Sequence, residues 1–95
     1  MRVSKSYRDK DTEKLAHGCL SRRLPSEIQR RAKMRLDRIE AAVELDDLRV
    51  PPSHRLERLK GDRAGRYSIR INDQWRICFD WRDGNAYDVE IVDYH

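Results

Sequence analysis

Residues 60–95 hold the side chains of this sequence that could carry out chemistry on a phosphodiester. The set comprises the cations Lys60 and Arg76, the carboxylate of Asp93, the phenol of Tyr94 and the imidazole of His95. Cationic side chains neutralise phosphate oxygens, and an imidazole can give or take a proton near neutral pH. Such a set can therefore bind a phosphodiester and transfer protons around it.

A band of basic residues surrounds this set. Residues 49–76 carry more Lys and Arg than Asp and Glu, and most of these cations are arginines. Guanidinium binds phosphate through a planar, bidentate fork, so we expect RNA contacts from Arg58, Arg66 and Arg70. The alternative is a solvated charged surface, which is the commoner meaning of a charge run. The abundance of arginine and its placement on expected strands favour nucleic acid.

Composition favours one folded domain spanning residues 1–95, with a thin core. The chain has 21 Lys and Arg against 17 Asp and Glu, a net charge of +4, and 38% hydrophobic residues. Cys19 and Cys78 are too few and too far apart for a metal motif or a disulfide framework, so we expect no cofactor and no metal. We expect a cytoplasmic protein with reduced thiols, because neither a signal peptide nor a membrane span is recognisable.

The elements that must position these side chains begin with a short strand and a short helix. Residues 3–7 are predicted to form the strand and residues 11–20 the helix, with Asp11 or Thr12 as its cap.

A longer helix is predicted from Ser26 to near Asp47, ahead of two prolines that a helix cannot include. Ser26 and Gln29 match a capping box. One apolar stripe follows helical spacing and should face a core. Its members are Ile28, Ala32, Leu36, Ile39 and Val43.

After the prolines the apolar period changes from helical spacing to strict alternation, which predicts three strands. Turns at Asn72-Asp73 and at Asp83-Gly84-Asn85 would join them into an antiparallel meander. The aromatic face should pack on the helices, leaving Arg70 and Arg76 on the open face. The predicted fold class is α+β, with a small twisted antiparallel sheet and helices packed on one face.

Several motifs of residues 55–95 resemble one protein family. They are the run Arg55-Leu56-Glu57-Arg58-Leu59-Lys60-Gly61-Asp62-Arg63, then Tyr67-Ser68-Ile69, Trp75-Arg76-Ile77 and Asp93-Tyr94-His95. Together they resemble the HigB-type (host-inhibition-of-growth, or plasmid maintenance killer) toxins of the RelE/ParE superfamily. The resemblance implies a compact RelE-like domain and a toxin that cuts messenger RNA in the ribosomal A site. The partners that it implies are a HigA-like helix-turn-helix antitoxin, the ribosome with its RNA, and operator DNA only through the antitoxin.

The resemblance also implies functional roles for Lys60, Arg76, Asp93, Tyr94 and His95. Cleavage without a metal would proceed by attack of the 2′-hydroxyl on its own 3′-phosphate, which needs a base, cations and an acid. We expect Arg76 to stabilise the pentacoordinate phosphorus, with Lys60 as second cation, and His95 to act in proton transfer. Asp93 would orient His95 or the 2′-hydroxyl, and Tyr94 would stack on a base or donate to phosphate.

One position departs from the family pattern, because Glu57 stands where many relatives carry a histidine. His54 lies three residues earlier, and on a strand this odd offset would turn it to the opposite face. Activity could be weaker, or Glu57 could take over part of the role. One alternative function is that of ParE-like relatives, which share the scaffold and inhibit DNA gyrase without catalysis. Another is that the basic helical face of residues 30–38 binds DNA or the antitoxin, although such a face is more often simply solvated.

Overall fold

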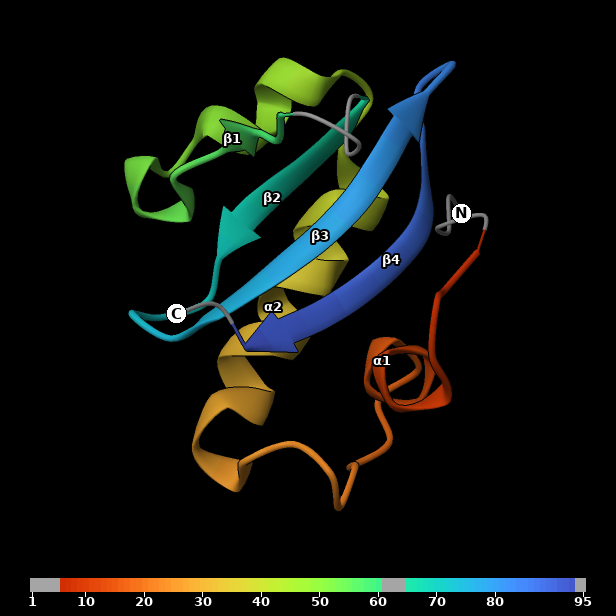
Figure 1. Cartoon of the computed structure of the whole chain (residues 1–95), viewed down its shortest axis with the longest axis vertical. Coiled ribbons are helices and arrows are strands. Elements are labelled where there is room, and N and C mark those ends of the chain that lie inside the picture. Colours follow the sequence, from red (N-terminus) through yellow and green to blue (C-terminus); the bar gives the residue numbers. More distant parts are fainter. Residues whose placement is uncertain (1–5, 61–64, 94–95) are drawn as a thin grey trace.

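The computed structural model describes residues 6–60 and 65–93 of the chain. Within these residues, helices of the first half are followed by an antiparallel sheet, which confirms the predicted α+β class (Figure 1). The elements in chain order are α1 (Lys10–Ala16), α2 (Ser26–Ala41), the 3-10 helices η1 (Leu45–Arg49) and η2 (Pro52–His54), and the strands β1 (Glu57–Arg58), β2 (Arg66–Arg70), β3 (Trp75–Arg82) and β4 (Asn85–Asp93).

The sheet has the strand order β1-β2-β3-β4, with every neighbouring pair antiparallel. Its last three strands form the predicted meander, and α2 lies behind them in Figure 1. Ile69, Ile77 and Ile91 are paired across these strands and belong to one buried cluster with the apolar stripe of α2. The two-residue strand β1 was not predicted, because it is too short to show alternation.

The helix α2 ends at Ala41, earlier than the sequence suggested. Ile28, Ala32, Leu36 and Ile39 are buried as predicted, but Val43 lies beyond the helix and is 64% exposed. The cause is a capping box at η1. The carboxylate of Asp47 accepts hydrogen bonds from the backbone N–H groups of Glu44 and Val43, which lowers its pKa. These bonds start a new helical turn in place of a continued α2.

The predicted capping box at the start of α2 was wrong. Pro25 occupies the N-cap position and offers no side-chain acceptor. The side chain of Gln29 is instead buried and forms hydrogen bonds to the loop that precedes α2. Its amide nitrogen donates to the carbonyls of Ser21 (2.6 Å) and Leu24 (2.9 Å), and its oxygen accepts from the N–H of Ser21 (3.1 Å). Tertiary contacts therefore outcompete the local cap.

The cap predicted for α1 was also wrong by a few residues. Asp9 is the N-cap, and its carboxylate accepts from the N–H of Thr12 at 2.7 Å. The helix ends at Ala16, and Gly18 then takes a left-handed backbone (φ 88°) that favours glycine.

Of the strand predicted at residues 3–7, only Ser6 and Tyr7 are described. Tyr7 forms a parallel bridge with Val89 of β4, flanked by backbone hydrogen bonds to that residue from both sides. Residues 3–5 lie outside the described part of the chain.

Candidate functional site

Helix α2 covers one face of the sheet and leaves the other open (Figure 1). Arg76 of β3 belongs to the open face, because its neighbour Ile77 packs in the buried cluster with the apolar stripe of α2. Arg76 is paired with Arg70 of β2 and with Val92 of β4. Residues directly opposite each other across a ladder share a face, so Arg70 and Arg76 lie on the same side, as predicted. Glu57 and Ser68 form the next pair on this face.

The guanidinium of Arg76 is held by the backbone and by one hydroxyl. Its Nε donates to Ser68 Oγ at 2.9 Å, and its Nη2 donates to the carbonyls of Arg55 (2.7 Å) and Ser68 (3.4 Å). The Nη2 atom also lies 3.8 Å from Glu57 Oε2. Only 9% of the Arg76 side chain is exposed, so the cation is both buried and fixed in orientation.

A cavity of about 330 Å³ opens beside this guanidinium. It is lined by Arg55, Glu57, Arg70, Asn72, Asp73 and Arg76. The two carboxylates lie at its rim, since the side chains of Asp73 and Glu57 are 96% and 54% exposed.

The carboxylates of Asp73 and Glu57 are the exposed partners in these two pairs, and Glu57 lies 3.8 Å from Arg76, so solvent can take over their contacts with Arg70 and Arg76 at small cost. An incoming phosphate could therefore replace a carboxylate at either guanidinium. The cavity has the size and charge to hold one phosphate group between two arginines.

Arg55 lines the cavity with an uncommon backbone. It follows η2 with φ 46° and ψ 57°, in the left-handed region that non-glycine residues rarely occupy. Its carbonyl accepts the 2.7 Å bond from Arg76. Local strain of this kind is often found at functional sites.

The other predicted residues are less closely grouped. Lys60 is exposed two residues after β1 and forms no hydrogen bond or ion pair with any described residue. Arg58 is exposed and pairs with Tyr67, so alternation places it on the side opposite to Glu57. Tyr94 and His95 lie outside the described residues.

Asp93 ends β4 opposite Trp75. By strand alternation it therefore belongs to the face opposite that of Arg76. Its carboxylate accepts a 3.1 Å hydrogen bond from the side chain of Gln74, next to the turn that precedes β3.

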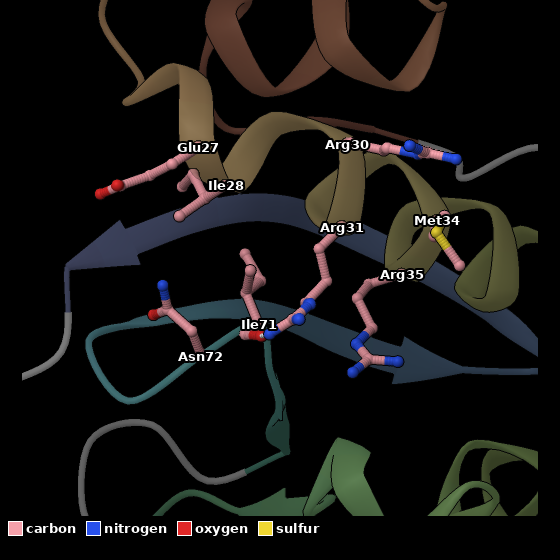
Figure 2. Close-up of a pocket in the computed structure, with 8 residues that line it drawn as sticks. All are labelled: Glu27, Ile28, Arg30, Arg31, Met34, Arg35, Ile71 and Asn72. Atoms are coloured by element: carbon pink, nitrogen blue, oxygen red, sulfur yellow. Dashed lines mark hydrogen bonds between the residues drawn. The ribbon is translucent and has the colours of Figure 1, made fainter.

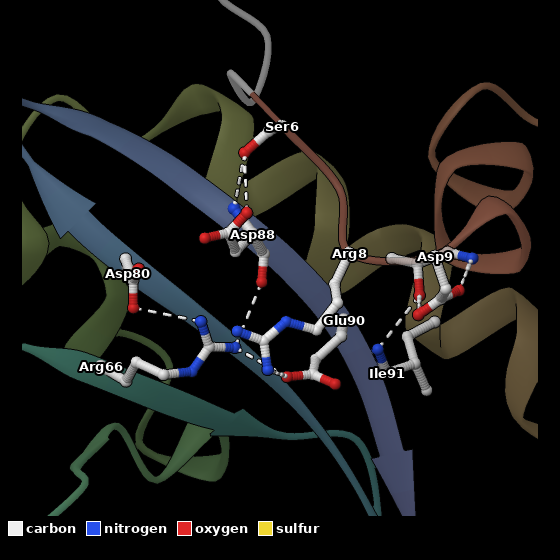
Figure 3. Close-up of polar contacts among 9 residues, drawn as sticks. Ser6, Arg8, Asp9, Arg66, Asp80, Asp88, Glu90 and Ile91 are labelled. Carbon is white, nitrogen blue, oxygen red and sulfur yellow. Dashed lines mark hydrogen bonds and ion pairs between the residues drawn. The ribbon is translucent and has the colours of Figure 1, made fainter. Parts of the chain in front are cut away.

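Arg66 was expected to contact RNA, but in the structure its guanidinium binds groups of the neighbouring strands. Its guanidinium donates to Asp80 (3.1 Å), to Glu90 (2.9 Å) and to the carbonyl of Asp88 (3.1 Å), as Figure 3 shows. Its side chain is 9% exposed. We correct the expectation because this guanidinium is buried among protein acceptors, at the opposite end of β2 from Arg70.

His54 is not among the residues that line the cavity beside Arg76. It ends η2 and is fully buried, not on a strand as the sequence reasoning assumed. Its Nδ1 lies 3.2 Å from the carbonyl of Leu48. Burial lowers the pKa of its imidazole, and the positive charges of Arg35 and Arg38 add to this effect.

Sequence reasoning missed Ser68 as a partner of Arg76. Alternation placed Ser68 on the face of Arg70, but its pairing partner depends on the register that the β2–β3 turn sets. That turn is fixed by Asn72, whose Oδ1 accepts from the N–H groups of Gln74 (2.9 Å) and Trp75 (2.8 Å).

Two features are absent from residues 6–60 and 65–93. No helix there has the length and hydropathy needed to cross a membrane. The same residues contain no group of three or more His, Cys, Asp or Glu side chains placed to hold a metal ion.

Comparison with known proteins covers nearly the whole chain. A family model described as "RelE-like toxin of type II toxin-antitoxin system HigB" matches residues 4–95. "Toxin HigB-1" of Vibrio cholerae is 43% identical over 65 residues, which is 68% of each chain. "Endoribonuclease HigB" of Proteus vulgaris is 34% identical over 91 residues, covering 96% of this chain and 98% of the relative. An uncharacterized protein of Haemophilus influenzae is 33% identical over 70 residues.

Proposed function

Since the chain belongs to the HigB-like family of RelE-like toxins, we propose that it is an endoribonuclease that cuts messenger RNA in the ribosomal A site. The Proteus vulgaris relative that matches almost end to end is named as an endoribonuclease. The reaction that we propose is attack of a 2′-hydroxyl on the adjacent phosphate, without a metal ion.

The observation that carries this proposal is the buried, oriented guanidinium of Arg76 beside a phosphate-sized cavity. Negative charge builds on the equatorial oxygens when phosphorus becomes pentacoordinate. A donor that is already fixed where this charge develops does not have to reorganise during the reaction. Arg70, from the neighbouring strand, would bind a second oxygen or the next phosphate along the RNA.

In the proposed step the 2′-oxygen forms a bond to phosphorus and the bond from phosphorus to the 5′-oxygen breaks. The proton of the 2′-hydroxyl passes to a base, and an acid gives a proton to the departing 5′-oxygen. Glu57 is our candidate for the base, because its carboxylate lines the cavity next to Arg76. His95 is our candidate for the acid. The products are a 2′,3′-cyclic phosphate and a 5′-hydroxyl.

The remaining residues would bind and orient the RNA. Lys60 is proposed as a second cation near the scissile phosphate, and Arg58 as a contact to the RNA backbone. Tyr94 would stack on a base or donate to phosphate. Asp93, at the end of β4, would orient His95.

Dependence on the ribosome follows from how few groups are available to align the reactants. Holding a hydroxyl in line with the scissile bond can supply several kcal/mol of the barrier, and the ribosome already holds the A-site message. We propose a HigA-like helix-turn-helix antitoxin as the partner that restrains the toxin, with operator DNA bound only through the antitoxin.

The test is to express the wild type and Arg76→Ala in cells and map the 5′ ends of messages by primer extension. We expect cuts in phase with codons from the wild type, carrying 5′-hydroxyl ends, and none from Arg76→Ala. Arg22→Ala, which changes an exposed loop arginine, should cut like the wild type. Equal cutting of free and ribosome-bound RNA would contradict the proposal. Growth arrest by Arg76→Ala with inhibited gyrase would favour the ParE-like alternative.

A further inference from the structure

A second hollow, of about 570 Å³, lies between α2 and the turn that joins β2 to β3 (Figure 2). We call it the α2 groove. Arg30, Arg31, Met34 and Arg35 line it from the helix, and Ile71 and Asn72 line it from the turn. Residues three and four apart on a helix are neighbours, so the four helical residues form one continuous face.

The arginines of the α2 groove carry positive charge that no ion pair with a described residue neutralises. Arg31 Nη1 donates to the carbonyl of Ile71 (3.3 Å), and Arg35 Nε donates to the carbonyl of Arg70 (3.1 Å). These bonds fix the guanidinium groups and leave their other donors for a ligand. Among the described residues, Arg30, Arg31 and Arg35 have no ion-pair partner. Burial lowers the pKa of Arg35, and the nearby Arg31 and Arg38 contribute, which indicates unrelieved repulsion.

An apolar side chain lies among these cations. Met34 is 57% exposed, whereas most of the apolar stripe of α2 is buried. An exposed, flexible methionine is typical of surfaces that bind other proteins. Glu27 also lines the groove and would repel a phosphate backbone. The combination of fixed arginines, an apolar contact and one carboxylate therefore fits a polypeptide better than RNA.

We propose that the α2 groove binds an acidic segment of the partner antitoxin. Carboxylates of that segment would pair with Arg30, Arg31 and Arg35, and an apolar side chain would cover Met34. The net charge of +4 on the toxin complements an acidic partner. This inference rests on the proposed function in one respect, namely that the toxin has an antitoxin.

The α2 groove adjoins the candidate RNA site. Asn72 lines both the groove and the cavity beside Arg76. Arg35 also binds the carbonyl of Arg70, whose side chain lines that cavity. An antitoxin segment that continued past Asn72 would therefore lie across the entrance for RNA, so binding in the groove and inhibition of cleavage are spatially coupled.

The test uses the intact toxin with substitutions at Arg30 and Met34, whose side chains are exposed and make no hydrogen bond to a described residue. Calorimetry would measure the affinity of Arg30→Glu/Met34→Glu and of the wild type for the purified antitoxin encoded beside the toxin. We expect at least about a tenfold loss of affinity at low salt. High salt should weaken the wild-type complex more than the variant complex, because the lost contacts are electrostatic. Cleavage by the free toxin should be unchanged.

The matched control is Arg22→Glu, which makes the same charge reversal in the loop between α1 and α2 and should bind like the wild type. An unchanged affinity of the double variant, or no binding of the antitoxin to the wild type, would overturn the inference. So would a variant that binds the antitoxin normally but no longer cuts ribosome-bound RNA, since the groove would then be an RNA contact. Loss of toxin self-association alone would point to a second copy as occupant and overturn it too. If the wild type cut no RNA but the affinity loss appeared, the proposed reaction would fail and this inference would stand.

Discussion

At the scale of single residues, Arg76 depends on a hydroxyl that the sequence does not mark as functional. Ser68 is fully buried, and its Oγ accepts the Nε–H of Arg76 at 2.9 Å. A guanidinium with its Nε, and one Nη, bonded to the protein has little freedom to rotate. We therefore regard Ser68 as a positioning residue for the proposed cleavage, acting through Arg76.

We predict that Ser68→Ala lowers kcat for cleavage of ribosome-bound message by about tenfold or more, with a smaller change in KM, because a misplaced cation stabilises the transition state less. The buried Nε–H left without an acceptor should also cost about 1–3 kcal/mol of stability. Single-turnover kinetics and urea unfolding would separate the two effects. Ser68→Thr keeps the hydroxyl and should recover most of kcat. Equal kcat in all three proteins would show that the hydroxyl only supports folding.

At the scale of elements, a series of hydrogen bonds connects α1 to β4, the strand that ends at Asp93. The carboxylate of Asp9 caps α1 and accepts from the hydroxyl of Thr12 at 3.1 Å. That hydroxyl in turn accepts a 3.1 Å hydrogen bond from the N–H of Ile91 in β4. Figure 3 shows Ile91 close to Asp9. Helix α1 therefore holds β4 two residues before Asp93.

We predict that Asp9→Ala lowers the free energy of unfolding by about 1–2 kcal/mol, because it removes the helix cap and frees the hydroxyl of Thr12. Asp9→Asn retains an acceptor oxygen and should lose much less. Urea unfolding at neutral pH is the measurement. The idea fails if the alanine variant unfolds at the same urea concentration as the wild type.

At the scale of the whole molecule, a charge network centred on the buried Arg66 connects three strands and the segment that precedes α1. Arg66 of β2 binds Asp80 of β3 and Glu90 of β4, and Glu90 also accepts from Arg8 at 3.0 Å (Figure 3). Removing one partner of a buried network leaves the others as unpaired charges in a poorly solvated place.

We accordingly predict that Arg66→Ala costs about 3 kcal/mol of stability. Cleavage per folded molecule should persist, because the role of Arg66 is structural. Circular dichroism melting would give the stability, and an activity assay well below the melting temperature would give the cleavage rate. A stable variant with lost cleavage would return Arg66 to the RNA-contact set.

The buried imidazole of His54 makes the stability of the whole fold depend on pH. Its pKa lies below the ordinary value of 6.5, so in mildly acidic solution the unfolded chain binds a proton that the folded chain does not. Stability from this residue is complete above about pH 6.5 and is lost as the pH falls through the folded pKa.

We expect His54→Asn, whose amide can still donate to the carbonyl of Leu48, to remove this dependence. The difference in unfolding free energy between the wild type and the variant should shrink between about pH 7.5 and about pH 5.5. Urea titrations at both pH values would measure it. A constant difference would mean that His54 titrates alike in both states.

The sequence by itself determined the family motifs, the amphipathic stripe of α2, the three-strand meander and the shared face of Arg70 and Arg76. These features are local, since helical spacing and strand alternation are written in neighbouring residues. Only the tertiary structure decided which groups surround Arg66 and Arg70, two arginines on the same face of one strand. Arg66 meets Glu90, 24 positions away in the sequence, whereas Arg70 meets the exposed Asp73 beside an open cavity. Which charges meet across a sheet is set by turns and register, and no local pattern encodes that pairing.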